Sequence, residues 1–486
     1  MKKLTDILAG IDYSGGLHSG DIYVSDICFD SRKAGKDKLF VAVRGTISDG
    51  HNYISEAIKL GAGAVICEKI PENPDPETCF IKVKDSAHVL AVCASNYYNN
   101  PSREIKLVGI TGTNGKTTTA SLLYRLFTSL GYKAGLLSTV ANYISGTELE
   151  ATLTTPDPVR INMLLREMIN EGCEFAFMEV SSHAVVQKRI AGLTFSMGIF
   201  TNITRDHLDY HGSFDNYLDA KKGFFDHLPA GSVALVNADD RNANFMLQNC
   251  KADRYEYSLK TVADYTCRIV EHRMDGMSLR FGNQEVWTGL IGEFNAYNLL
   301  AVSSAAELLG QDHVEVLTNI SGLKPVAGRF EVIRSAMGTT AIVDYAHTPD
   351  ALENVLSAIN KIRQTGNKLI TVVGAGGDRD RGKRPIMARI SAEKSDRVIL
   401  TSDNPRTEDP DKIIDDMIKG IPSKLQARVL RITDRREAIR TASMIAGDND
   451  IILVAGKGHE TYQEIMGHRH HFDDREELRK VFMSAN

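Results

Sequence analysis

The stretch that most constrains this chain is a short apolar run followed by a glycine-rich loop. Residues 105–110 are apolar and rich in β-branched side chains, which predicts a buried strand. Thr111-Gly-Thr-Asn-Gly-Lys-Thr-Thr118 follows, and residues 120–130 then have the apolar spacing of a packed helix that Gly131 would end. A strand, a glycine loop and a helix in this order form a phosphate cradle, because glycines let backbone N–H groups approach phosphate oxygens at the positive end of the helix.

Within this loop, Lys116 and Thr117 have the chemistry that ATP binding needs. Lys116 would neutralise charge on the outer phosphates, and the Thr117 hydroxyl would bind Mg²⁺. The match to the common P-loop is imperfect, because Ile110 stands where the first glycine belongs and Gly112 supplies the turn instead. A chance Gly-Lys-Thr in a glycine-rich turn is the simpler alternative, but the flanking strand and helix argue against it. We therefore predict an ATP site.

The composition limits the class of protein. A length of 486 residues predicts about three domains. The net charge of −5, with no basic run, argues against a nucleic-acid partner. Seven scattered cysteines without a Cys-x-x-Cys pair favour the reducing cytoplasm over a disulfide framework. The sequence has neither a signal-peptide core at its start nor an apolar run of about 18 residues, so we expect no membrane partner.

Residues 1–100 form a first unit without an ATP motif. The strand predicted at residues 38–44 lies between two polar clusters, Phe29-Asp-Ser-Arg32 and Gly45-Thr-Ile-Ser-Asp-Gly-His51. These clusters could hold a nucleotide or a sugar, but on these residues alone ordinary turns are the preferred explanation. Tyr97-Tyr-Asn-Asn-Pro-Ser-Arg103 has the composition of a linker, which places a domain boundary near residue 100.

From residue 101 to about 330, apolar strands repeatedly end in polar residues. Residues 175–180 run into Ser181-Ser-His183, and residues 196–200 run into a segment rich in His and Asp. Residues 232–236 run into Asn237-Ala-Asp-Asp240. Strands that alternate with helical segments predict a mostly parallel sheet, whose ligands collect at the carboxyl ends of the strands.

Glu179 and His207 lie at two of these strand ends and could meet a cation bound near Thr117. A single Glu or His is more often structural, but two of them beside a phosphate loop make a ligand role as good an explanation. The His and Asp residues at 206–211 could instead suggest zinc. No cysteine accompanies them, and Mg²⁺ prefers oxygen ligands, so we predict Mg²⁺ with Glu179 as a better ligand than His207.

Residues 331–486 have the pattern of a doubly wound sheet. Four apolar strands, at residues 341–345, 368–373, 397–401 and 451–455, each end in a glycine-rich or charged loop. Gly374-Ala-Gly-Gly resembles a dinucleotide-binding turn but lacks the third glycine at the right spacing, so we do not predict NAD. His468-Arg-His-His471 could bind a metal, although a solvated surface run is the preferred explanation.

The loops of this third unit carry charges that suit an amino acid. Arg379 and Arg406 offer planar guanidinium groups for a carboxylate, and Glu460 offers an anion for an ammonium group. Together they predict a site for a zwitterion.

Six motifs, in this order along nearly the whole chain, make it resemble the Mur ligases. They are Gly112-Thr-Asn-Gly-Lys-Thr-Thr118, Glu179-Val-Ser-Ser-His183, Thr201-Asn-Ile-Thr-Arg-Asp-His-Leu-Asp209, Asn295-Ala-Tyr-Asn298, Gly328-Arg-Phe-Glu331 and Asp344-Tyr-Ala-His347. The resemblance implies an α/β protein of three domains. These are a smaller N-terminal α/β domain (1–100) for a UDP-substrate, a central P-loop ATPase-like parallel sheet (101–330) for ATP, and a C-terminal Rossmann-like doubly wound domain (331–486) for an amino acid.

The family resemblance also implies roles for individual residues. The implied catalytic residues are Lys116, Lys221, His207 and Glu179, and the implied Mg²⁺ ligands are Thr117, Glu179, His207 and a carbamate on Lys221. ATP would contact Gly112, Thr113, Asn114, Gly115, Lys116, Thr117, Thr118, Asn298, Arg329 and Asp344. A UDP-muramoyl dipeptide would contact Phe29, Ser31, Thr46, Ile47, Ser48, Thr154, Thr155, Ser181, Gln187 and Arg189, although Leu153 stands where relatives can carry an asparagine. The incoming amino acid would contact Arg379, Asp403, Asn404, Pro405, Arg406, Gly456 and Glu460.

Within the family, Asp403-Asn-Pro-Arg406 resembles the motif that recognises meso-diaminopimelate. Lysine has no distal carboxylate to pair with Arg406. The implied reaction is the ATP-dependent addition of meso-diaminopimelate to the D-glutamyl carboxylate of UDP-MurNAc-L-Ala-D-Glu, through an acyl phosphate. It belongs to peptidoglycan precursor synthesis, and so to cell wall biogenesis, cell shape and cell division. We expect a cytoplasmic monomer whose partners are small molecules.

Three alternatives remain open on the sequence. Two are other ligases of the superfamily, a lysine-adding enzyme and a folylpolyglutamate-type enzyme. The third is a P-loop nucleotide-binding switch that performs no ligation.

Overall fold

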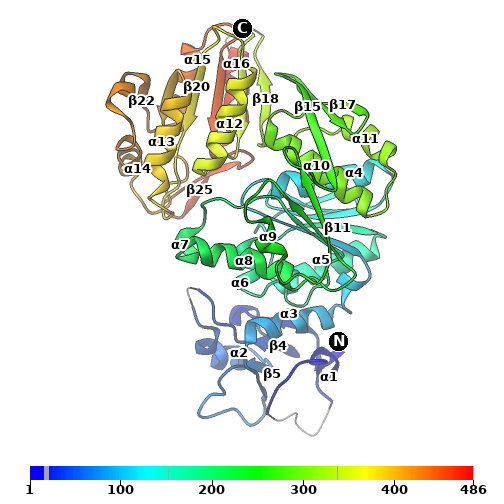
Figure 1. Cartoon of the computed structure of the whole chain (residues 1–486). Coiled ribbons are helices and arrows are strands. Elements are labelled where there is room, and N and C mark those ends of the chain that lie inside the picture. Colours follow the sequence, from blue (N-terminus) through cyan, green and yellow to red (C-terminus); the bar gives the residue numbers. More distant parts are fainter. Residues whose placement is uncertain (16–20, 47, 152, 337, 485–486) are drawn as a thin grey trace.

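Three sheets, each covered by its own helices, follow one another along the chain. The computed structural model describes residues 1–15, 21–46, 48–151, 153–336 and 338–484. Figure 1 shows the three sheets as three bodies in a row, with the N-terminal body at one end and the C-terminal body at the other. The predicted mixed α/β class, with a mostly parallel central sheet, is confirmed.

The N-terminal body is built on four parallel strands in the order β3-β4-β5-β6. Alternate side chains of these strands enter two small cores, one closed by α1 and α3 and the other by α2. The elements are β1 (Lys2–Lys3), α1 (Leu4–Ile7), β2 (Tyr23–Val24), β3 (Asp26–Cys28), η1 (Ser31–Lys33), β4 (Lys38–Val41), η2 (Gly50–Tyr53), α2 (Ile54–Lys59), β5 (Ala64–Cys67), β6 (Cys79–Lys82), α3 (Ser86–Tyr97) and η3 (Pro101–Arg103).

The central body is an eleven-stranded sheet in the order β10-β9-β8-β11-β7-β12-β13-β14-β15-β16-β17. Neighbouring strands from β8 to β15 are parallel, and antiparallel pairings extend the sheet at both edges. The strands are β7 (Lys106–Thr111), β8 (Ala134–Leu137), β9 (Asn142–Ile144), β10 (Thr147–Leu149), β11 (Phe175–Glu179), β12 (Met197–Phe200), β13 (Val233–Asn237), β14 (Asp253–Ser258), β15 (Tyr265–Arg273), β16 (Gly276–Phe281) and β17 (Gln284–Thr288).

Helices cover both faces of this sheet, so its central strands are apolar on both sides. The helices α4, α10 and α11 pack on one face, and α5, α8 and α9 pack on the other. The helices of this body are α4 (Lys116–Ser129), α5 (Pro158–Asn170), α6 (Ser182–Val186), α7 (Leu208–His211), α8 (Phe214–Asp226), α9 (Ala243–Leu247), α10 (Glu293–Leu308) and α11 (His313–Ser321).

The C-terminal body has a six-stranded sheet in the order β18-β19-β23-β20-β21-β22, in which only β18 is antiparallel. The helices α12, α13 and α14 cover one face, and α15 and α16 cover the other. The elements are β18 (Glu331–Arg334), β19 (Thr340–Asp344), α12 (Pro349–Ile362), β20 (Leu369–Val373), α13 (Lys383–Lys394), β21 (Arg397–Leu400), α14 (Pro410–Ile418), η4 (Ser423–Arg428), β22 (Val429–Arg431), α15 (Arg435–Ile445), β23 (Ile451–Ala455), β24 (Tyr462–Ile465), β25 (His468–His471) and α16 (Asp474–Ser484).

The strands predicted from apolar runs are present with shifts of a few residues at their ends, but two local details differ. Helix α4 begins at Lys116, before the predicted apolar segment, because Thr117, Thr118 and Thr119 are buried in its first turn despite being polar. The antiparallel edge formed by β15, β16 and β17 was not predicted. Among the described residues, none of the helices has the length and apolar character that a membrane span requires.

Phe127 in α4 provides a test of the central core. Its ring lies 4.4 Å from that of Phe175 and 5.1 Å from that of Phe177, and it has no exposed surface. We expect Phe127→Ala to lower the free energy of unfolding by about 3–5 kcal/mol, because it removes these contacts and leaves a cavity. Urea unfolding followed through Trp287, the one tryptophan of the chain, measures the change in this body.

The matched control is Val262→Ala, since Val262 is 97% exposed. That variant should stay within about 0.5 kcal/mol of the parent protein. Equal unfolding midpoints for the two variants would contradict this account of the core.

Candidate active site

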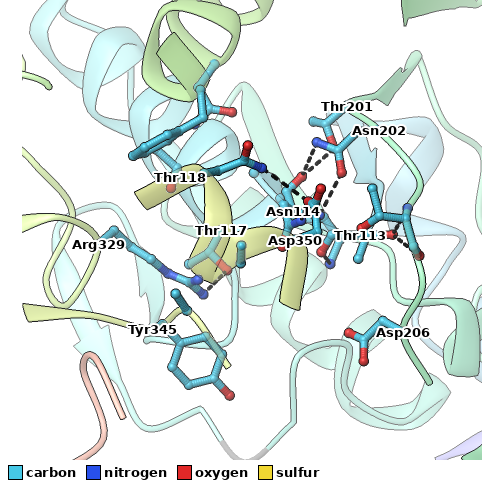
Figure 2. A pocket seen from close by; sticks show the side chains of 18 of the residues that line it. Thr113, Asn114, Thr117, Thr118, Thr201, Asn202, Asp206, Arg329, Tyr345 and Asp350 are labelled. Carbon is cyan, nitrogen blue, oxygen red and sulfur yellow. Dashed lines mark hydrogen bonds between the residues drawn. The ribbon is translucent and has the colours of Figure 1, made fainter. Parts of the chain in front are cut away.

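A cavity of about 990 Å³ lies where the loops after β7, β11 and β12 meet the C-terminal body. The central body contributes the glycine loop, and the C-terminal body contributes the segment after β19 and one side of α12. Figure 2 shows Asp350 of the C-terminal body beside Asn114, and Arg329 beside Thr117. The cavity therefore brings together residues that are far apart in the sequence.

The glycines of the loop are required by their positive φ angles and by close contacts with neighbouring side chains. Gly112 has φ +152°, and a Cβ atom there would lie 1.9 Å from the Thr201 Oγ1. Gly115 has φ +88°, and a Cβ atom would lie 2.6 Å from the Asn298 Oδ1. The Thr201 hydroxyl donates to the Asn114 carbonyl at 2.6 Å, which fixes the loop against the end of β12. Only glycine fits both positions.

Two lysines converge on this loop. Lys116 Nζ donates to the carbonyls of Gly112 and Thr113, each at 2.8 Å. Lys221 Nζ of α8 donates to the same Gly112 carbonyl at 2.6 Å, and Lys221 is 1% exposed. Burial lowers the pKa of both ammonium groups, and the neighbouring Lys116 charge lowers that of Lys221 further. The Lys221 amine is therefore biased toward its neutral, nucleophilic form.

The Thr117 hydroxyl and Glu179 form the polar centre of the cavity. The Thr117 hydroxyl donates to Glu179 Oε2 at 2.9 Å, and Arg329 Nη2 donates to the Thr117 Oγ1 at 3.0 Å. The other carboxylate oxygen of Glu179 accepts from the backbone and the hydroxyl of Thr139 at 2.7 and 3.0 Å. Glu179 has no exposed surface. These hydrogen bonds fix its position.

The oxygen atoms of Thr117 and Glu179 fit a Mg²⁺ ion. In the part of the chain that the structure describes, no group of three or more His, Cys, Asp or Glu side chains is placed to hold a metal. Mg²⁺ does not need such a group, because it is usually bound by one or two protein oxygens, waters and substrate phosphates. His468–His471 form the exposed strand β25, which agrees with the prediction that these residues lie on the solvated surface.

Several histidines around the cavity are held in the neutral form. Burial, followed by His183 and then the nearby lysines, lowers the pKa of His207 to about 3, although Asp206 lies 3.3 Å away and opposes the shift. Burial also lowers the pKa values of His183 and His347 to about 4. At neutral pH these rings are therefore uncharged, and one nitrogen of each ring has a lone pair that can bind a proton or a cation.

The other predicted ATP residues lie around the same loop. The Thr113 hydroxyl is 2.9 Å from the Tyr217 hydroxyl, Thr118 lines the cavity, and Asn298 Nδ2 donates to the Asn295 side chain at 3.1 Å. The Asp344 carboxylate accepts from the backbone N–H groups of Phe330 and Ala346 at 2.7 and 2.8 Å. Burial raises the pKa of Asp344 to about 6, against the effect of Arg329.

Four of the ten residues predicted for the UDP-muramoyl dipeptide line the cavity, namely Thr154, Thr155, Ser181 and Arg189. Thr155 donates through its hydroxyl to the Glu179 carbonyl at 2.8 Å and accepts the Ser181 N–H at 3.1 Å. Arg189 donates to the Thr155 carbonyl at 2.6 Å and, through two nitrogens, to the Gln187 side chain. The Thr154 hydroxyl accepts from that of Thr139 at 3.1 Å, and Leu153 also lines the cavity.

The residues predicted for the uridine end lie in the N-terminal body, away from the cavity. Phe29 is 40% exposed, the Ser31 hydroxyl donates to Glu56 at 3.0 Å, and Thr46 and Ser48 are exposed. Ile47 lies outside the described residues. These residues therefore lie on a surface separate from the cavity, and their role in binding uridine stays a prediction.

The residues predicted for the amino acid form their own cluster beyond the cavity, with Arg379 between the two. Arg379 lines the cavity and lies 3.9 Å from Asp209. Arg406 Nη1 donates to the Gly377 carbonyl at 2.7 Å, and a Cβ on Gly376 would lie 3.0 Å from the same nitrogen and 3.7 Å from the Arg379 side chain. Asp403, Asn404, Pro405, Gly456 and Glu460 occupy the loops after β21 and β23.

Two cavity residues were missed by reasoning from the sequence. Asn202 Oδ1 accepts the Asn114 N–H at 3.0 Å, and Asp350 accepts from the Asn114 side chain at 2.8 Å. Asp350 lies in the first turn of α12, where an acidic residue is ordinary, so its sequence carries no signal of a role. Burial raises the pKa of Asp350.

Comparison with known proteins gives the family. The model of the Mur ligase middle domain matches residues 110–306, that of the Mur ligase glutamate ligase domain matches residues 328–458, and that of the Mur ligase family catalytic domain matches residues 24–98. A UDP-N-acetylmuramoyl-L-alanyl-D-glutamate–2,6-diaminopimelate ligase from Parabacteroides distasonis is 54% identical over 480 residues, which are 99% of both chains. The chain belongs to the Mur ligase family.

Further relatives of this Mur ligase support the family assignment. A protein of the same name from Cytophaga hutchinsonii is 55% identical over 456 residues, which are 94% of each chain. A solved structure titled as that same ligase superposes with a TM-score of 0.69 and 33% sequence identity, covering 100% of this chain and 99% of the other. The predicted family and the three-domain Mur ligase fold are therefore confirmed.

The neutral state of His347 predicts a pH dependence of stability. Its folded pKa of about 4 lies below the ordinary value of about 6.5, so the unfolded chain takes up a proton as the pH falls below 6.5 and the folded protein does not. Stability that is present at pH 7 is therefore lost toward pH 5, by about 1–2 kcal/mol for this one group. We expect this loss to be smaller by that amount in His347→Gln.

Urea unfolding at pH 7 and pH 5, followed by circular dichroism, measures both proteins. A parallel decline in the parent protein and in His347→Gln would contradict the assignment of a buried neutral ring.

Proposed function

We propose that this Mur ligase joins meso-diaminopimelate to the D-glutamyl carboxylate of UDP-MurNAc-L-Ala-D-Glu in an ATP-dependent reaction of peptidoglycan precursor synthesis. The observation that carries the proposal is the identity of 54–55%, over nearly the full chain, to ligases named for this reaction. The cavity supports it, because the phosphate loop, Glu179 and the side chain of Arg379 line one space.

The chemistry follows from the poor reactivity of a carboxylate. Transfer of the γ-phosphoryl group of ATP to the D-glutamyl carboxylate gives an acyl phosphate and ADP. The amine of meso-diaminopimelate then attacks the acyl carbon, and phosphate leaves with the C–O bond electrons. Phosphoryl transfer depends mainly on positioning and charge neutralisation, which Lys116 and Arg329 are placed to supply. A nearby base, His347 or a carboxylate, would accept the proton from the attacking amine.

Mg²⁺ would be held by the Thr117 hydroxyl and the Glu179 carboxylate, with His207 as a further candidate ligand, and would neutralise phosphate charge. Burial lowers the pKa of the Lys221 amine and so favours the neutral form that carbamate formation with carbon dioxide requires. The N–C bond forms as one amine proton leaves, and the two carbamate oxygens are hard ligands of the kind Mg²⁺ prefers.

The wider assignments follow the same proposal. Residues 1–100 bind the UDP moiety, residues 101–330 bind ATP, and residues 331–486 bind the amino acid. The enzyme acts as a monomer in the cytoplasm on small molecules alone, and all seven cysteines are buried.

The decisive experiment is formation of the product. The purified chain is incubated with ATP, Mg²⁺, UDP-MurNAc-L-Ala-D-Glu and, separately, meso-diaminopimelate, lysine or glutamate, and products are identified by mass. We expect an amide product with meso-diaminopimelate, and we expect Lys116→Ala to abolish it, because the variant removes the ammonium group that the glycine loop itself supplies to the phosphates. Lys424→Ala, an exposed lysine of η4, is the matched control and should remain active. ATP hydrolysis without any amide product would overturn the proposal in favour of a nucleotide switch.

Arg406 should decide between the ligase alternatives. Lysine has no distal carboxylate to pair with the Arg406 guanidinium, which we expect to disfavour lysine by roughly two or more decades in kcat/KM. We expect Arg406→Leu to lose most of this preference while acyl phosphate formation, measured as ADP release without an amino acid, persists. Comparable turnover of lysine and meso-diaminopimelate by the parent protein would support the lysine-adding alternative, and turnover of glutamate the folylpolyglutamate-type alternative.

A further inference from the structure

The loops after β20 and β21 each carry one arginine of the predicted amino-acid site, and the two loops lie against each other. Arg379 belongs to the first loop and Arg406 to the second. A Cβ atom on Gly376 would lie 3.0 Å from Arg406 Nη1 and 3.7 Å from the Arg379 Cγ, so both side chains pass the same point of the backbone. A Cβ atom on Gly377 would lie 1.9 Å from the Pro405 carbonyl oxygen, which leaves room only for glycine.

Both loops contain a residue whose backbone lies in the left-handed region. Asp378 has φ +53° and Arg406 has φ +52°. This conformation is unfavourable for most residues other than glycine, and it persists where surrounding contacts hold it. Here the contacts run from one loop to the other. The Asp378 N–H donates to Glu408 Oε1 at 2.7 Å, the Thr407 hydroxyl donates to the Asp378 carboxylate at 2.8 Å, and Arg406 Nη1 donates to the Gly377 carbonyl at 2.7 Å.

Arg384 of α13 and Glu408 form the buried part of this junction, and we term the pair the loop clamp. The side chain of Arg384 is 1% exposed and that of Glu408 is 15% exposed. Arg384 Nη2 donates to Glu408 Oε1 at 2.7 Å, and Nη1 donates to Oε2 at 3.1 Å. Two parallel hydrogen bonds of this kind hold a guanidinium and a carboxylate in one geometry. The hydrogen bonds from Arg384 lower the pKa of Glu408 to about 2, so the carboxylate is ionised at neutral pH.

The loop clamp acts on the backbone next to both arginines of the site. Glu408 follows Arg406 by two residues, and Asp378, whose N–H Glu408 accepts, directly precedes Arg379. One carboxylate therefore joins the two loops, and Arg384 anchors that carboxylate to α13.

We propose that the loop clamp is a positioning pair which fixes the distance between Arg379 and Arg406, and that the site thereby selects its acceptor by the distance between the two carboxylates of that acceptor. The inference rests on the proposed function and adds a determinant of its specificity. Two guanidinium groups on a rigid backbone can both pair with an acceptor only when the spacing of its carboxylates agrees with theirs. Loops that could move apart or together would follow a longer or a shorter acceptor.

The test compares meso-diaminopimelate with two homologues that carry the same two amino groups and two carboxylates. These are meso-2,5-diaminoadipate, which is one methylene shorter, and meso-2,7-diaminosuberate, which is one methylene longer. We expect the parent protein to prefer meso-diaminopimelate over each homologue by about 100-fold in kcat/KM. Glu408→Gln keeps the shape of the side chain but removes the ion pair, and it should lower this preference to about tenfold, mainly through a higher KM for meso-diaminopimelate.

Asp416→Asn is the matched control. Asp416 of α14 accepts from the same Arg384 at 3.1 Å but lies in neither arginine loop, so this variant should leave the preference within about threefold of the parent value. Thermal unfolding checks that both variants are folded. ADP release in the absence of an amino acid should be unchanged in both, because acyl phosphate formation uses ATP and the UDP-muramoyl dipeptide alone.

Thr407→Val is a second variant of the same junction. It removes the exposed hydrogen bond from the Thr407 hydroxyl to Asp378 and leaves the buried loop clamp intact. We expect the preference for meso-diaminopimelate to fall by about threefold, because one of several contacts between the loops is lost. If Glu408→Gln does not fold, this variant decides, and an unchanged preference then overturns the inference.

Three outcomes would overturn the inference while sparing the proposed function. The first is amide formation by the parent protein with equal preference for the three acceptors. The second is an unchanged preference in a folded Glu408→Gln variant, and the third is an equal loss of preference in Asp416→Asn. Absence of acyl phosphate formation in the parent protein would instead overturn the proposed function.

Discussion

The Glu179 carboxylate at the end of β11 is fully buried, and the rest of the site is arranged around its hydrogen bonds. An ionised carboxylate away from water is costly unless donors surround it. Its donors are the hydroxyl of Thr117 in α4 and the backbone and side chain of Thr139 after β8. These hydrogen bonds fix the loops after β7, β8 and β11 relative to one another. They also direct a carboxylate oxygen of Glu179 and the Thr117 hydroxyl toward the same point of the cavity.

The C-terminal body is joined to this centre by a small number of polar contacts. Arg329 reaches Thr117, and Asp350 accepts from Asn114 of the glycine loop. Ile291 and Phe294 of the central body add an apolar contact with the C-terminal core. The ion pairs across the same gap, Arg205 with Asp380 at 3.9 Å and Lys361 with Glu293 at 2.7 Å, are partly or largely exposed and contribute little. A sparse, polar junction suits an enzyme whose parts approach one another during turnover.

The two halves of the proposed chemistry use burial in opposite ways. Around the glycine loop, burial drives amines and imidazoles toward their neutral forms, as for Lys221 and His207. Below the loops that follow β21 and β23, buried charges are paired instead, as Arg435 at the start of α15 pairs with Asp474 at the start of α16 at 2.8 Å. One side of the site thus favours groups that exchange protons or bind a cation, and the other favours groups that recognise a charged substrate.

The sequence by itself determined the elements whose signal is local. The apolar strands, the glycine loop between β7 and α4, and the α/β class follow from runs of side chains and from the need for glycine where backbone approaches backbone, as at Gly112. The order of several motifs was enough to indicate the family. Residues such as Glu179 were identifiable because they end apolar strands, which in a parallel sheet must meet at one edge.

Only the tertiary structure decided which distant residues share an environment. The contacts of Asp350 with Asn114 and of Lys457 with Asn404 depend on how segments after different strands converge, and neither Asp350 nor Lys457 stands out in its own segment. The pKa shifts likewise arise from burial and from charges brought in by folding, as Lys116 is brought beside Lys221. The edge strands β15, β16 and β17 escaped prediction for a similar reason, since their pairing is set by the sheet they extend more than by their own composition.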